Sequence, residues 1–103
     1  MTEKKLLGLL QQKRGFFEAI LDLTEEETSL PVPEWISNLE QKKVLLSCID
    51  ELDEQMTPYK AKFADIVPEI SEELEKIKDV VGRILHCDSL NLEYRKKQFD
   101  EHL

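Results

Sequence analysis

The chain of 103 residues is long enough for one hydrophobic core, and its formal net charge of −8 argues against nucleic acid and anionic membranes as partners. The composition is 41% hydrophobic and 35% charged, with only three glycines and four prolines, a balance typical of a folded protein built from long helices. We therefore expect one domain spanning residues 1–103, and a basic or uncharged segment as its preferred binding partner.

The first predicted helix covers residues 2–28, where apolar residues recur every three or four positions and so share one helix face. This stripe consists of Leu6, Leu9, Leu10, Phe16, Phe17, Ile20, Leu21 and Leu23. Lys13 interrupts it. Gly8 and Gly15 either admit a close neighbour or weaken the helix by about 1 kcal/mol each. Glu25–Glu27 oppose the helix dipole at the C-terminal end, so we expect that end to fray.

The second predicted helix begins at Pro33 or Glu34, after a proline-containing segment that must end the first helix. Its apolar stripe consists of Trp35, Ile36, Leu39, Leu45, Leu46, Ile49, Leu52 and Met56. Thr57 and Pro58 supply a cap and a proline, which stop or bend this helix. Residues 59–67 carry enough apolar side chains for two more turns, and we expect a short extra helical segment there.

The third predicted helix begins at Pro68 and continues toward the end of the chain. Its stripe consists of Ile70, Leu74, Ile77, Val80, Val81, Ile84 and Leu85. The three helices would span about 39, 35 and 51 Å at about 1.5 Å per residue, so the last turns of the third helix lack a full set of partners. We predict an all-α fold: an elongated antiparallel three-helix bundle, coiled-coil-like, with the extra segment between helices two and three.

The sequence offers little for catalysis or metal binding. His86, Cys87 and Asp88 are adjacent, but adjacent helical residues point about 100° apart and cannot hold one ion. Cys48 and Cys87 are interpreted as free thiols near the core of a cytoplasmic protein, with a disulfide or metal pair as the alternative. No apolar run could span a membrane, and the N-terminus lacks the layout of a signal peptide. We expect no enzyme activity, cofactor or metal.

Four polar residues lie beside or within the predicted apolar stripes: Asp50, Asp53, Asp88 and Asn91. Paired carboxylates can do acid–base chemistry when burial shifts the pKa of one of them. Far more often, such a pair is a solvated or hydrogen-bonded flank of the helix. Polar residues on an otherwise apolar seam tend to fix helix register or partner choice, at a cost in stability. We interpret these four as determinants of register and specificity.

The end of the third helix carries a second group of apolar residues, which we predict to bind a partner. They are Leu90, Leu92, Tyr94, Phe99 and Leu103. In one interpretation they complete the core against the loop at residues 31–35. In the other, some of them line an exposed apolar groove that receives a partner helix.

Two segments resemble a known family. Residues 39–53, LEQKKVLLSCIDELD, resemble the L-x-x-K-x-x-L-L-x-x-I-D-x-L-D stretch of bacterial flagellar export chaperones of the FlgN and FliT type. Residues 84–91, ILHCDSLN, resemble their I-L-x-x-D-x-x-N stretch. The resemblance implies a cytoplasmic chaperone that binds a helical terminal segment of a type III secretion substrate. That substrate would be a hook–filament junction protein or the filament cap protein, kept from self-association and delivered to the export apparatus.

Two other classes of function exist for helical bundles of this length. A structural or regulatory bundle without an export role would act through dimerisation or by binding a partner helix. A helical chorismate mutase has similar length, but its dianionic substrate needs several converging cations, and the chain has only Arg14, Arg83 and Arg95 as arginines.

Overall fold

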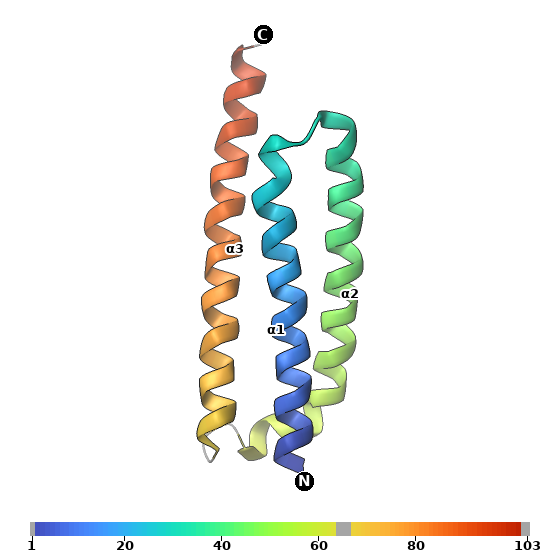
Figure 1. The fold of residues 1–103 in the computed structure, drawn as a ribbon, viewed down its shortest axis with the longest axis vertical. Helices are drawn as coiled ribbons and strands as arrows, with labels where there is room; N and C mark the ends of the chain where they lie inside the picture. The colour runs from blue at the N-terminus through green and yellow to red at the C-terminus, as the bar shows by residue number, and fades with distance from the viewer. Residues whose placement is uncertain (1, 64–66, 102–103) are drawn as a thin grey trace.

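The computed structural model describes residues 2–63 and 67–101, which form three long helices and one short helical turn (Figure 1). The elements are α1 (Thr2–Glu26), the 3-10 turn η1 (Glu27–Ser29), α2 (Val32–Phe63) and α3 (Pro68–Glu101). The described residues include no strand, so the predicted all-helical bundle is confirmed. None of the helices in these ranges combines the length and apolar content that crossing a bilayer requires.

The bundle is elongated, 58 × 20 × 17 Å, and α1 lies between α2 and α3 (Figure 1). Polar contacts across the two interfaces show how the helices run relative to α1. They are Lys13–Asp53 between α1 and α2, Glu27–Lys42 between η1, which follows α1, and α2, and Arg14–Glu73 and Thr24–Asn91 between α1 and α3. As the residue number along α1 and η1 rises, the residue number of the contact falls along α2 and rises along α3.

The hydrophobic core follows α1, because α1 is the helix that packs against both of the others. At its N-terminal end the fully buried side chains are Leu6, Leu10, Met56 and Ile70. A second cluster follows along the bundle and joins Ile20, Ile49, Val80 and Ile84. Burying such a side chain contributes about 1.5–3 kcal/mol, so these two clusters supply most of the force that holds α2 and α3 to α1.

Of the two outcomes expected at Pro58, a stop or a bend of the helix, the structure does not show the stop, and residues 59–63 belong to α2 and do not form a separate segment. Helix α2 continues through Pro58 to Phe63, and its last turns change direction toward the N-terminal end of α1, passing behind it in the view of Figure 1. A proline inside a helix removes one hydrogen bond and bends the axis at a cost of about 3 kcal/mol. Met56 is fully buried before Pro58, and Tyr59 packs on the same core cluster after it. Burial on both sides of the proline offsets that cost.

The predicted stripe of α2 divides between two faces of the helix. Leu45, Ile49, Leu52 and Met56 face α1, either buried or partly buried against the core. The remaining aliphatic members of the stripe, Ile36, Leu39 and Leu46, are exposed. Consecutive residues such as Leu45 and Leu46 point about 100° apart, so one face could not bury both. Helix α2 therefore carries a second apolar face that nothing in the described chain covers.

Alanine substitutions test the two interpretations of the glycines in α1. A Cβ atom built on Gly8 or Gly15 meets nothing within 4 Å outside the local helix, so no close neighbour requires a glycine there. We expect Gly8→Ala and Gly15→Ala each to raise the free energy of unfolding by about 0.5–1 kcal/mol, because alanine has the higher helix propensity. Urea denaturation measures the change, and a loss of stability in either variant would contradict it.

Candidate functional site

A groove of about 420 Å³ runs between α2 and α3, with α1 as its floor. The floor is formed by Phe17, Ile20, Thr24 and Glu27, which recur every three or four residues along α1. The α2 wall consists of Leu39, Lys42, Lys43 and Leu46, and the α3 wall of Val81, Ile84, Leu85, Asp88 and Arg95. The groove exists because α2 and α3 pack mainly on α1 and leave the space between their outer halves open.

Large apolar side chains are exposed on both walls of this groove. Leu39 is 51% exposed and Leu46 47% exposed on α2, while Leu85 is 64% exposed on α3. Both helices continue the pattern at a spacing of seven, with exposed Val32 before Leu39 and exposed Leu92 after Leu85. Apolar residues seven apart form the seam by which one helix packs on another. Each wall therefore carries a helix-packing seam that lacks a partner helix within the described chain.

The residues predicted to bind a partner do not gather on one surface. Leu92 belongs to the seam on the groove side, whereas Leu90, two positions earlier, points about 200° away and lines a different hollow. Tyr94 is 42% exposed. The Phe99 side chain and all of Leu103 lie outside the described part of the structure. Residues 32–35 form the first turn of α2 and not a loop, and the guanidinium of Arg95 lies 5.3 Å from the centre of the Trp35 ring.

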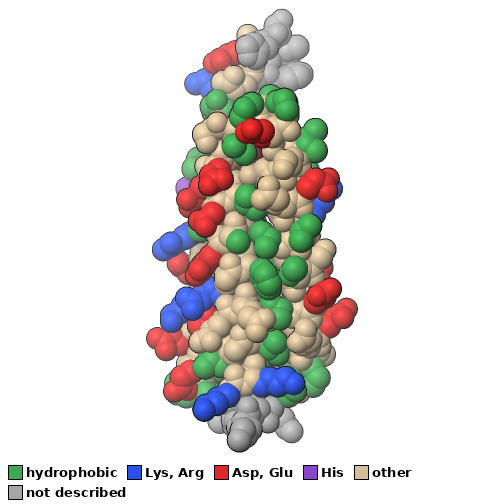
Figure 2. Space-filling view, turned by 45° about the vertical axis from the view of Figure 1, so that its right-hand side comes forward, with side chains coloured by type: hydrophobic (Ala, Val, Ile, Leu, Met, Phe, Trp, Pro, Cys, Tyr) green, Lys and Arg blue, Asp and Glu red, His purple; other side chains and the backbone are tan. Residues whose placement is uncertain are grey.

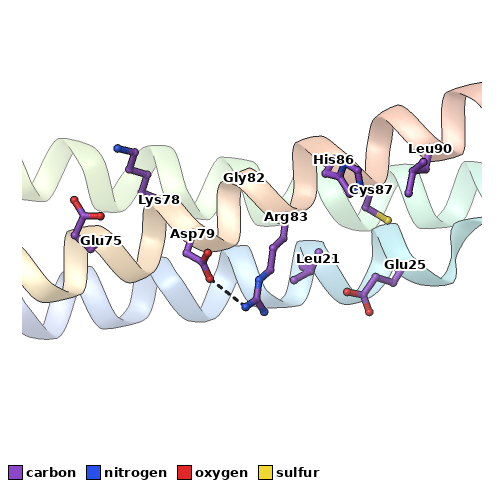
Figure 3. A pocket seen from close by; sticks show the side chains of 10 residues that line it. All are labelled: Leu21, Glu25, Glu75, Lys78, Asp79, Gly82, Arg83, His86, Cys87 and Leu90. Carbon is purple, nitrogen blue, oxygen red and sulfur yellow. Dashed lines mark ion pairs between the residues drawn. The ribbon is translucent and has the colours of Figure 1, made fainter.

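The hollow beside Leu90, of about 740 Å³, lies on the other side of α3 (Figure 3). Leu21 and Cys87 line it, and Arg83 pairs with Asp79 at 3.2 Å along its edge (Figure 3). Burial, and then the nearby carboxylates of Glu25 and Asp88, raise the pKa of the Cys87 thiol. A thiol with a raised pKa stays protonated and is a poor nucleophile, so this hollow does not resemble a cysteine active site.

The described residues include no group of three or more histidine, cysteine or acidic side chains placed to hold a metal ion. Cys48 and Cys87 are both half-buried free thiols, on α2 and α3. The face displayed in Figure 2 carries a broken line of hydrophobic side chains with acidic side chains on both sides of it.

A buried ionic cluster closes one end of the groove. Glu27, only 5% exposed, begins η1 and accepts contacts from two cations. Its Oε1 lies 3.3 Å from Lys42 Nζ of α2, and its Oε2 contacts the guanidinium of Arg95 of α3. Glu27 therefore joins all three helices near the end of α1. The sequence analysis expected acidic residues, including Glu27, to fray the C-terminal end of the first helix. The contacts with Lys42 and Arg95 neutralise the Glu27 carboxylate.

The four polar residues predicted to set register lie in different environments. Asn91 is buried and donates from Nδ2 to the Thr24 carbonyl at 2.8 Å, which fixes α3 against α1. Asp53 accepts from Lys13 Nζ at 2.6 Å, which links α2 to α1. Asp88 is exposed and lies 4.0 Å from Lys42 on the groove wall, and Asp50 is exposed on α2.

Sequence reasoning missed two buried acids, Glu27 and Glu73. Glu73 is 3% exposed on α3 and lies 2.5 Å from Arg14 Nε of α1. Helix periodicity does place Glu73 in phase with buried Ile70 and Ile77, three and four residues away. This helical phase is the sequence signal that could have identified Glu73 as buried. Adjacent apolar residues on α2 and α3, such as Leu45 and Leu46, are the corresponding signal for a second apolar face on each of these helices.

Comparisons with protein-family models, with curated proteins and with solved structures find no match to this chain.

Proposed function

We propose that this protein binds an amphipathic helix of another protein in the groove between α2 and α3. We propose further that it does so as a cytoplasmic export chaperone of the FlgN and FliT type, holding a helical terminal segment of a hook–filament junction or filament cap protein. In this proposal the molecule is an antiparallel, coiled-coil-like three-helix bundle whose open face receives the client. The observation that carries the proposal is the exposed apolar seam on each wall of one groove.

The geometry supports a helix as the occupant. The two walls face each other across α1, and both place apolar side chains at the spacing of seven that suits packing against one further helix. A fourth helix in the groove would contact both walls and the floor at once and would complete a four-helix arrangement. Exposed leucines would then leave water, and each fully buried one would contribute about 1.5–3 kcal/mol.

The wall residues and the apolar seam of the client would have to contribute together to a transient chaperone complex. A dissociation constant of about 1 μM corresponds to about 8 kcal/mol, and ordering two partners costs at least about 4 kcal/mol. Three wall leucines, Leu39, Leu46 and Leu85, and Leu92, which continues the α3 seam, are already partly buried, so together they would supply about 3–7 kcal/mol, and the apolar seam of the client would supply the rest. The client would be held reversibly, as delivery to an export apparatus requires.

Charge substitutions in the groove test the proposal. Synthetic peptides that correspond to the terminal helices of hook–filament junction and cap proteins from the same genome serve as ligands, and fluorescence anisotropy measures their binding. We expect Leu46→Asp and Leu85→Asp each to weaken binding about 30-fold, because a carboxylate on the wall must be desolvated when the helix docks. Both positions are exposed, so circular dichroism should show unchanged helicity.

Two matched variants control for a general effect of added charge. Val44→Asp lies on α2 and Leu90→Asp on α3, and both replaced side chains are exposed but do not line the groove. We expect these variants to bind within twofold of the parent protein. Unchanged binding in Leu46→Asp and Leu85→Asp would reject the groove. Light scattering of the unliganded protein reports whether a second copy occupies the groove instead, as a dimerising adaptor would require.

A further inference from the structure

We propose that the helix received by the groove carries a carboxylate beside its apolar seam, placed to pair with Lys43. This inference rests on the proposed function and specifies the chemistry of the partner. It reverses, for the residues inside the groove, the preference for a basic or uncharged segment that the net charge of −8 suggests. The charged side chains that line the groove, and not the net charge of the whole chain, would lie next to the docked helix.

The groove lining is basic although the chain is acidic. Its charged residues are three cations, Lys42, Lys43 and Arg95, and two acids, Glu27 and Asp88. Both oxygens of Glu27 are taken, Oε1 by Lys42 and Oε2 by Arg95. Asp88 lies 4.0 Å from Lys42, which leaves both acids engaged with the two inner cations.

Lys43 is the remaining cation. Its side chain is exposed on the α2 wall, and it forms no ion pair with any residue in the described ranges. It lies four residues after Leu39 and three before Leu46, so on a helix it shares their face. A helix that packs on those two leucines would bring its own seam-flanking residue close to the Lys43 ammonium.

Docking removes water from this region, which strengthens both attraction and repulsion between charges. A glutamate or aspartate at the flanking position would pair with Lys43. A lysine or arginine at the same position would place two positive charges together where docking has removed water. Lys43 therefore disfavours a helix with a basic residue at that position. A second copy of the chain is a poorer occupant, because two molecules of charge −8 repel each other as they approach.

Two designed peptides of 18 residues test the inference with the full chain. Both have the same leucine seam at a spacing of seven. One has glutamate at the central seam-flanking position and lysine on its outer face, and the other has these two residues exchanged, so composition and net charge are equal. We expect the first peptide to bind about tenfold more tightly in fluorescence anisotropy at low salt, with the difference decreasing at high salt.

Substitution of Lys43 tests whether this residue causes the preference for the glutamate-centred peptide. Lys43→Glu should reverse the order of the two peptides, whereas Lys97→Glu, an equal change of charge at an exposed α3 position outside the groove lining, should preserve it. Equal affinities, or a preference for the lysine-centred peptide, would overturn the carboxylate inference and leave the groove intact. Binding of neither peptide at 1 mM would overturn the groove itself. Binding only to monomer released from a dimer would assign the groove to a second copy.

Discussion

Replacing Glu27 with alanine is expected to lower the free energy of unfolding by about 3 kcal/mol, because breaking a buried ion pair leaves an uncompensated charge inside the protein. Glu27 neutralises Lys42, whose side chain is only 11% exposed, and it also contacts Arg95. In the variant, Lys42 would retain only the more distant Asp88. Denaturation in urea measures the loss, and for a chain of this size it corresponds to a fall of about 12–24 °C in Tm.

Glu26→Ala is the matched control for this prediction. Glu26 is adjacent in sequence and carries the same charge, but it is exposed and ends α1 rather than joining the ionic cluster. We expect its replacement to change stability by less than about 0.5 kcal/mol. Equal effects of the two substitutions would show that the local helix end, and not the pairing with Lys42 and Arg95, accounts for the loss.

Arg14→Ala is expected to cost about 3 kcal/mol, since it would leave the Glu73 carboxylate buried and unpaired between α1 and α3. Arg14 Nε lies 2.5 Å from Glu73 Oε1, and the Glu73 side chain is 4% exposed. The double variant Arg14→Met with Glu73→Leu removes both charges and fills the space with apolar atoms. We expect it to be about as stable as the parent protein, or more stable. Urea denaturation distinguishes the two outcomes.

The exposed pair Arg83–Asp79 provides the comparison for Arg14. These side chains are 67% and 64% exposed and lie 3.2 Å apart on one face of α3. Arg83→Ala should cost no more than about 0.5 kcal/mol, as expected of an ion pair at spacing four in water. Similar losses for Arg14→Ala and Arg83→Ala would contradict the assignment of Glu73 as a buried, dependent carboxylate.

Local signals in the sequence located most of the helices. Pro68 fixes the start of α3, and proline near residue 31 separates α1 from α2. The stripe of α1 predicted its buried residues Leu6, Leu10 and Ile20. These features depend on backbone chemistry and on periodicity within one helix, so they can be predicted from a single sequence.

The path of α2 through Pro58 could not be predicted in the same way. Proline disfavours a helix locally, and the compensation comes from burial of Met56 and Tyr59 against side chains of α1 and α3. That energy depends on helices far away in sequence. The same reason accounts for Glu27, whose two partners, Lys42 and Arg95, lie 15 and 68 residues further along the chain.

The proposed groove coincides only in part with the surface that the sequence predicted to bind a partner. The sequence pointed to an apolar surface on α3, and Leu92 does belong to the groove seam, but Leu90 points to the opposite side. The sequence does not reveal the contribution of α2, because Leu39 and Leu46 share one predicted core stripe with Leu45, and only Leu45 packs against the core. Deciding which of two apolar faces is buried requires the position of α1, which periodicity alone does not supply.

The central position of α1 also affects how selective the groove can be. Because α2 and α3 both rest on α1, the distance between the walls is not fixed by a closely packed interface between them. Among the described residues, the long side chain of Lys42 crosses the gap to Asp88, and such a side chain adjusts its reach by rotamer changes. In the proposed function, we expect the groove to widen or narrow around helices of different diameter. Shape would then discriminate weakly between clients, and the position of charge along the docked helix would be the main basis for choosing among them.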